Sequence, residues 1–270
     1  PGTGRLRNIL VVAQFAVSIG LIVCTAVIYA QTVHARTSDP GYHREGLLQI
    51  GNIGRLAIQP LVPTLLAEIG KVEGVEAIGR STIGVATFAM ENITVTARGA
   101  TDAVEFSLYR VDPSFFRTMG IRTLAGRTFV EGRAMDDSTI EGFPPDPADQ
   151  AALARRGYNV VLNELAARSM GFARPADAIG KTLKADDGDV EANGQTPVTI
   201  IGVVRDSRFR SVRDPAEPMM FVSARPAPTW LLVRSPGSPP AHRDRIEKVW
   251  KRVAPDQPFE AEYSDDIVRE

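Results

Sequence analysis

The hydrophobic positions of this chain form one long uninterrupted run followed by many short patterned segments. Residues 9–30 carry no charged side chain, and their clearly polar members are Gln14, Ser18 and Thr25. A helix over this run is about 33 Å long, which is enough to cross the hydrocarbon core of a bilayer. The run exceeds the roughly 7–15 apolar residues of a signal peptide. The sequence therefore predicts a transmembrane helix with its flanks over residues 1–36, surrounded by the lipid bilayer.

The basic residues around this run indicate how the helix is oriented. Arg5 and Arg7 precede it, whereas the segment that follows contains only His34 and Arg36. The positive-inside rule then places the N-terminus in the cytoplasm and the residues after about 31 outside it. Because the sequence opens with Pro1 rather than Met, we expect it to be a piece of a longer protein.

Both ends of the remaining chain predict a strand–helix–strand unit. Apolar segments at 47–50 and 75–78 flank a stretch with apolar residues at helical spacing, which we expect to run to about Gly74. Segments at 230–234 and 259–263 flank a second such stretch. The apolar faces of the two helices are Val62, Leu65, Leu66, Ile69 and Val72, and Ile246, Val249, Trp250 and Val253. Ser264 is placed to cap a further helix.

The middle of the chain predicts mainly strands. Residues 93–97 and 104–111 alternate as half-buried strands do, and residues 198–204 are rich in β-branched side chains. Asn163 is placed to cap a helix after a short apolar strand. The acidic, proline-rich stretch 131–157 predicts a long exposed loop.

These patterns predict an α+β protein in which a membrane helix precedes two subdomains. Residues 37–114 and 226–270 would form a discontinuous mixed α/β subdomain. Residues 115–225 would form a strand-rich subdomain inserted into it.

Composition and charge exclude several classes of function. The net charge of −1 gives no basic excess for nucleic acid, so no nucleic-acid partner is expected. Cys24, the single cysteine, lies in the apolar run, which excludes a disulfide framework or a cysteine zinc site.

Individual motifs point to no reaction. Residues 180–182 read Gly-Lys-Thr, but a phosphate-binding loop needs glycine where Pro175 stands. Residues 186–189 lack the ligand alternation of a calcium loop and are interpreted as a solvated hairpin. The arginines around Phe209 either contact a partner or anionic lipid, or form a charged connection after a buried strand. They are Arg205, Arg208, Arg210 and Arg213. We therefore assign no catalytic, cofactor-binding or metal-binding residue, and Gln14 becomes a candidate for packing against another membrane helix.

Several segments in a fixed order give the chain a resemblance to the MacB/FtsX-type permease family of ABC transporters. The most specific is VDPSFFRTMGI at 111–121, followed by LAGRTF at 124–129. The others lie at 7–18, 39–42, 160–168, 179–183, 198–206 and 217–222. The resemblance identifies the region after the helix as a MacB-like periplasmic core domain and implies the same two-subdomain fold.

The motif residues have structural explanations. The candidate structural residues are Phe115, Phe116, Gly120, Gly126, Arg127, Asn163, Gly180 and Gly202. Phenylalanines supply core area and glycines permit tight turns or close packing. The long segment 131–157 departs from the family pattern.

The resemblance implies a function without catalysis. Such a permease subunit works with a cytoplasmic ABC ATPase subunit or domain, dimerises as a homodimer or heterodimer, and can engage a periplasmic adaptor. It resides in the bacterial inner membrane and converts ATP-driven motion into efflux or other conformational work outside the membrane. Further membrane helices are then expected after Glu270. The alternatives are a signal-anchored extracytoplasmic sensor or binding module, and a membrane-anchored hydrolase.

Overall fold

The structure is a computed structural model that describes ten stretches of the chain. They are residues 2–37, 39–87, 91–97, 102–140, 142, 146–186, 195–210, 216–224, 229–237 and 239–267. The chain divides into two compact units, Pro1–Asp39 and Pro40–Glu270.

The first unit is a single long helix, α1 (Gly2–Thr37). The part from Arg7 to Gln31 has a mean hydropathy of 2.4 and none of it is buried within the protein. It is the one described helix long and apolar enough to cross a membrane. Thr25 donates its hydroxyl proton to the carbonyl of Leu21 (2.8 Å), so this polar side chain is satisfied within the helix. The predicted apolar helix is present.

The second unit begins and ends in four antiparallel strands, which belong to one larger sheet. Their order is β11 (Ala261–Tyr263), β1 (Leu47–Ile50), β10 (Trp230–Arg234) and β2 (Ala77–Ser81). Because β1 and β2 are both antiparallel to β10, they run parallel to each other, and α2 (Val62–Ile69) connects them. In the same way α8 (Pro239–Val253) connects β10 to the parallel β11. Two interlocked strand–helix–strand units of this kind form a ferredoxin-like split βαβ arrangement.

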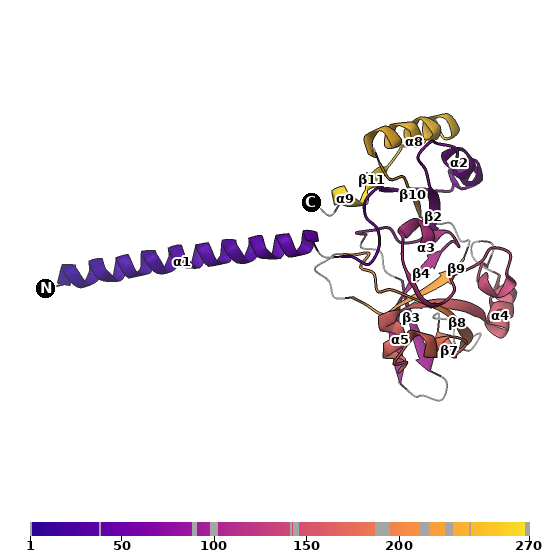
Figure 1. The fold of residues 1–270 in the computed structure, drawn as a ribbon, viewed down its shortest axis with the longest axis horizontal. Coiled ribbons are helices and arrows are strands. Elements are labelled where there is room, and N and C mark those ends of the chain that lie inside the picture. The colour runs from indigo at the N-terminus through magenta and orange to yellow at the C-terminus, as the bar shows by residue number, and fades with distance from the viewer. Residues whose placement is uncertain are drawn as a thin grey trace. The chain divides into compact units, whose positions relative to one another are not determined.

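Both faces of this part of the sheet are buried. Leu48, Ile50 and Val233 face α2 and α8, which lie together on one side of the sheet (Figure 1). Leu47 and Leu232 point to the opposite face, where α3 (Phe115–Met119) packs. We call these four strands with α2, α3 and α8 the sheet half. The predicted helix–strand order is confirmed, although α2 ends at Ile69 rather than near Gly74.

Six of the remaining strands close into a barrel. Successive pairings run from β4 (Ala103–Val111) to β3 (Asn92–Ala97), β7 (Thr182–Asp186), β8 (Thr196–Val204), β6 (Tyr158–Asn163) and β9 (Met219–Ser223). The ring closes because β9 also pairs with β4. Alternate residues of all six strands fill the interior, as in other small barrels. We call the ring and the helices on it the barrel half.

Short elements complete the barrel half. They are β5 (Thr123–Gly126), α4 (Pro147–Arg156), α5 (Glu164–Ser169) and α6 (Pro175–Ala178), with 3-10 turns at Gln59–Leu61 and Ala134–Asp136 elsewhere in the unit. A last short helix, α9 (Ser264–Ile267), follows β11 and begins at the predicted Ser264. The barrel takes β3 and β4 from the part of the chain before residue 115. The predicted subdomain boundaries, 37–114 with 226–270 and 115–225, stay a prediction.

The prediction of one exposed loop over 131–157 is wrong. The stretch contains a 3-10 turn and the helix α4, whose N-cap Asp146 accepts from the amide of Ala148 (2.8 Å). Asp136 is only 2% exposed, and four donor nitrogens from three residues surround its carboxylate. The acidic composition of 131–157 therefore does not indicate that the carboxylate of Asp136 is buried and hydrogen-bonded.

Candidate functional site

The segment Pro40–Gly46, which leads from α1 into the second unit, is bound to the barrel half. We call it the N-terminal linker. The amide of Arg208 donates to the carbonyl of Pro40 (2.7 Å), and the hydroxyl of Ser207 donates to the carbonyl of Gly41 (3.1 Å). A Cβ at Gly41 would lie 2.0 Å from the carbonyl oxygen of Asp206, and the φ of Gly41 is +83°. Only glycine fits this close approach.

The same linker is also bound to the sheet half. The amide of His43 donates to the carbonyl of Met119 at the end of α3 (2.9 Å). Arg234 of β10 donates to the carbonyls of His43 (2.6 Å) and Glu45 (2.6 Å) and to that of Thr118 (2.8 Å). The amide of Ser235 donates to Gly46 (2.8 Å). The linker is therefore held from both halves at once.

An aromatic cluster fills the junction between the halves beneath the linker. The ring of Tyr42 lies 5.6 Å from that of Phe209, which lies 5.1 Å from Tyr109. Phe115 and Phe221 continue the cluster at 6.0 Å from each other. Aromatic rings at such separations add favourable pair interactions to the area they bury. The junction is thus a packed core.

Gly120 fixes the end of α3 against the linker. It is the helix C-cap in the left-handed conformation, with φ +68°. A Cβ there would lie 2.6 Å from Nδ1 of His43. This glycine is needed both for its conformation and for the space that His43 occupies.

The loop 82–87 makes a second connection between the halves. Gln49 of β1 exchanges two hydrogen bonds with the backbone of Val85, at 2.9 and 3.1 Å. The next amide, that of Ala86, donates to the carbonyl of Phe209 (2.6 Å). Ala86 has φ +57°, a conformation that non-glycine residues adopt at a cost.

Charges around the linker extend to the C-terminal helix. Burial lowers the pKa of Arg234, while the negative charges of Glu76 and Asp265 oppose that shift. Burial raises the pKa of Tyr42, while the charge of Arg44 opposes this shift and the charge of Asp265 adds to it. Asp265, whose charge contributes to both of these pKa shifts, belongs to α9.

Three of the predicted structural residues, Phe115, Phe116 and Gly120, lie in this junction, and the others lie apart from it. Phe115 and Phe116 are buried in the aromatic cluster. Asn163 caps α5 by accepting from the amide of Ala166 (2.9 Å), and its oxygen also accepts from the amide of Met219 (2.9 Å). Gly180 has a positive φ in the turn before β7. Gln14 is exposed in the other unit.

Gly126, Arg127 and Gly202 belong to one close contact in the barrel half. A Cβ at Gly202 would lie 2.1 Å from the carbonyl oxygen of Arg127, and one at Gly126 would lie 2.2 Å from that of Ile201. The guanidinium of Arg127 forms two hydrogen bonds with Asp136, at 2.6 and 3.0 Å. Burial by itself would raise the pKa of Asp136, but hydrogen bonds from Arg127, Asn159 and Val130 lower it.

The motifs considered for chemistry have structural roles or lie outside the described residues. Gly180 and Lys181 form a turn in which the amide of Gly180 donates to the carbonyl of Ile200 (2.8 Å). Most of 186–189 lies outside the described residues, as does Arg213. Phe209, between the remaining arginines, is 2% exposed and part of the junction core. Within the described stretches, no group of three or more histidine, cysteine or acidic residues is placed to hold a metal.

A pocket of about 370 Å³ lies beside α4, away from the linker. It is lined by Thr139, Ile140, Asp149, Ala152, Leu153 and Arg156. The guanidinium of Arg156 is already bonded to the carbonyls of Asp137 and Gly157. This pocket shows no reactive arrangement.

The sequence did not single out Tyr42, Gln49 or Arg234 as parts of the junction. One signal was present for Arg234, because a charged residue closes the otherwise apolar strand 230–234. The partners of these side chains lie 36 to 191 residues away in the chain, and no local pattern encodes them.

Comparisons with known proteins agree with this architecture. A family profile described as "MacB-like periplasmic core domain" matches residues 11–249. A search of curated proteins gives no match. The periplasmic region of MacB from Actinobacillus actinomycetemcomitans is similar in structure, with 14% identity, TM-score 0.52, and coverage of 85% of this chain and 93% of that one. At this identity the likeness concerns the fold.

Two further solved structures match with TM-scores below 0.5. One is the extracellular domain of YknZ, a noncanonic ABC-type transporter from Gram-positive bacteria, with 14% identity, TM-score 0.42 and coverage of 74% and 86%. The other is a domain of a putative permease from Porphyromonas gingivalis, with 17% identity, TM-score 0.46 and coverage of 81% and 89%.

Proposed function

Since this chain belongs to the family of MacB-like periplasmic core domains, we propose that it is the first membrane helix and the extracytoplasmic domain of an ABC transporter permease subunit. It transmits conformational change from a cytoplasmic ATPase subunit or domain to the outside of the inner membrane. The domain itself performs no bond chemistry. Its output is rigid-body motion that drives efflux or other work on a partner.

The observation that carries this proposal is the double attachment of the N-terminal linker. Ser207 and Arg208 bind it from the barrel half, and Arg234 and Met119 bind it from the sheet half. A segment with one attachment transmits a pull to one half only. A segment bonded to both halves at their junction can change the angle between them when it is displaced.

A second support comes from the other end of the domain. The helix α9 ends the described chain beside β1, the strand that the linker leads into. In the proposed permease, further membrane helices follow residue 270, and the subunit dimerises and can meet a periplasmic adaptor. Membrane connections at both ends would let the domain be driven from two points.

The test is a crosslink between the two halves. The amide of Ala86 donates to the carbonyl of Phe209, the residue that precedes Arg210. Both Ala86 and Arg210 are partly exposed. In the full-length permease assembled with its ATPase, Ala86→Cys and Arg210→Cys are joined by oxidation or a short thiol reagent, on a background from which Cys24 and any other native cysteine have been removed. We expect ATP binding to survive and coupled activity to be lost, then restored on reduction.

Single-cysteine variants treated identically are the matched controls. Coupled activity that persists at full crosslinking would contradict the proposal, because the halves would then not need to move.

A further inference from the structure

Arg234 is a charged residue buried within the domain. The residue is 8% exposed, and its guanidinium donates to three neutral carbonyl oxygens, those of His43, Glu45 and Thr118. Two of these acceptors belong to the N-terminal linker and the third to α3. A buried cation loses its hydration, and neutral acceptors restore only part of it. A buried guanidinium therefore needs a negative charge nearby.

No carboxylate in the described part of the chain forms a salt bridge with Arg234, although many other arginines do so. Arg80, Arg110 and Arg127 each bind an acid within 3.3 Å. Burial lowers the pKa of Arg234, and the charges of Glu76, just before β2, and of Asp265 in α9 oppose that shift. In the strand order, only β1 lies between β10, which carries Arg234, and β11, which α9 follows.

We propose that Arg234 is a positioning residue that couples the two ends of the domain, binding the N-terminal linker through its hydrogen bonds and depending on the charge of Asp265 in α9. Displacing α9 removes compensating charge from Arg234 and loosens the linker, and the reverse also holds, because such coupling is reciprocal. This inference rests on the proposed function, in which both ends of the domain lead to membrane helices.

The geometry explains why arginine is required at this position. The three acceptors come from two segments, and the planar guanidinium offers five N–H donors in fixed directions. Nε donates to the carbonyl of Thr118 in α3, whereas Nη1 and Nη2 donate to the carbonyls of Glu45 and His43 in the linker. A lysine ammonium keeps the charge but does not reproduce this divided geometry.

Hydrogen exchange of the whole 270-residue chain in detergent micelles tests the coupling. The amide of His43, bonded to Met119, and that of Ser235, bonded to Gly46, report whether the linker is held. For Asp265→Asn we expect exchange in peptides covering 40–47 to rise about fivefold or more, the lower end of typical coupling between sites. Peptides covering strand 158–163 in the barrel half serve as an internal reference. Unchanged exchange at 40–47 overturns the proposal.

Asp256→Asn is the matched control. It removes the same charge from an exposed residue of the sheet half, and we expect wild-type exchange at 40–47. An equal rise in this control would also overturn the proposal, because net charge alone would explain it.

A double-variant comparison separates coupling from local stability. Once Arg234→Met has removed the cation, adding Asp265→Asn should change exchange at 40–47 no further. If Arg234→Met does not fold, Arg234→Lys replaces it, and the effect of Asp265→Asn should then be smaller than in the wild type. Fully additive effects would refute the coupling. These measurements need no ATPase, so a failed crosslinking test with a positive exchange result would reject the proposed function alone.

Discussion

Replacing Asp136 with asparagine should destabilise the domain far more than its place in an acidic, proline-rich stretch suggests. The carboxylate accepts four hydrogen bonds. Arg127 Nη1 (2.6 Å) and the amide of Val130 (2.9 Å) donate to Oδ2, and Arg127 Nη2 (3.0 Å) and Asn159 Nδ2 (2.7 Å) donate to Oδ1. An asparagine of the same shape turns one acceptor oxygen into an NH₂ group that faces two donors. Two of the four bonds are lost, together with the charge.

The magnitude follows from those losses. A hydrogen bond to a charged group contributes about 1.5–3 kcal/mol. The bond to Arg127 is discounted, because that side chain is 36% exposed and screened by water. The sum is a loss of about 3 kcal/mol. With an m-value of about 3 kcal/mol/M for a domain of this size, the urea midpoint falls by about 1 M.

Urea unfolding of the chain in detergent micelles, followed by tryptophan fluorescence, measures this shift. Asp177→Asn is the control, since Asp177 pairs with Arg174 on the surface, where the two side chains are 38% and 79% exposed. We expect its midpoint to match the wild type. If Asp136→Asn behaved like Asp177→Asn, the buried ion pair would not hold residues 127–136 against the barrel as described.

Three further predictions follow from the described contacts. The pKa of Asp136 is lower in the folded protein than its unfolded value of about 3.9, so its charge stabilises the fold above that pH. This contribution is lost as the pH falls through the folded pKa. The difference in unfolding free energy between wild type and Asp136→Asn should therefore shrink below about pH 4 in an acid titration. Gly120→Ala should cost about 2 kcal/mol or more, from the positive φ and the clash with His43. Gly132→Ala has a φ of +81° but open space, so thermal unfolding should show the smaller, purely conformational loss. Gln14→Leu should weaken association of the membrane helices of the full-length permease by about 1 kcal/mol, measured by a fluorescence energy-transfer titration. Thr25→Val should leave that association unchanged, because the hydroxyl of Thr25 is bonded within α1. Equal effects of the two substitutions would contradict the packing role of Gln14.

Local patterns in the sequence predicted the elements well. The alternation at 93–97 and 104–111 and the β-branched run at 198–204 are strands, because period-two burial is visible in the residues themselves. Asn163 caps a helix as expected, since capping involves residues two or three positions apart. Closure of the barrel was not visible, because it depends on the parallel pairing of β4 with β9, more than a hundred residues apart.

The junction escaped prediction for the same reason. The partners of Arg234 are contributed by α3 and the linker, and those of Gln49 by a loop far along the chain. Composition also misled in one place, because the acidic stretch 131–157 contains Asp136, whose burial depends on Arg127 and Asn159 arriving from both sides. Local sequence specifies which residues can be strands, caps or turns. It does not specify which distant donors meet them.

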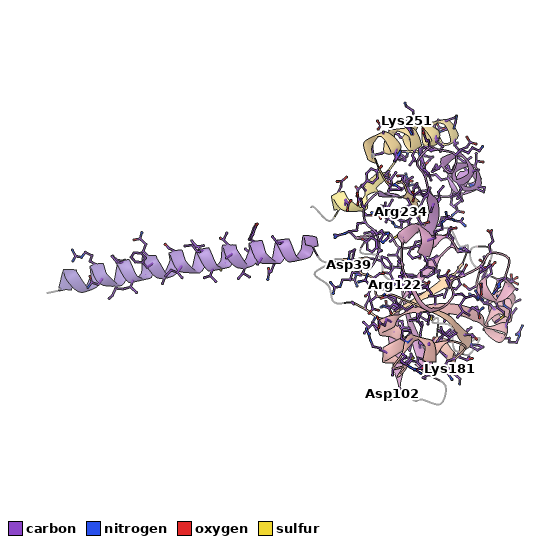
Figure 2. The ribbon with its side chains drawn as sticks, in the orientation of Figure 1. Asp39, Asp102, Arg122, Lys181, Arg234 and Lys251 are labelled. Carbon is purple, nitrogen blue, oxygen red and sulfur yellow. The ribbon has the colours of Figure 1, made fainter. Side chains whose placement is uncertain are left out.

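The central claim is that the sheet half and the barrel half move relative to each other during the ATP cycle. Lys251 of α8 and Lys181 before β7 are exposed and lie at opposite ends of the second unit (Figure 2). Spin labels at Lys251→Cys and Lys181→Cys, on a background from which Cys24 and any other native cysteine have been removed, report their separation by pulsed electron paramagnetic resonance in the full-length permease with its ATPase. The account predicts different distance distributions in the nucleotide-free and ATP-trapped states. Identical distributions in an actively cycling transporter would contradict it.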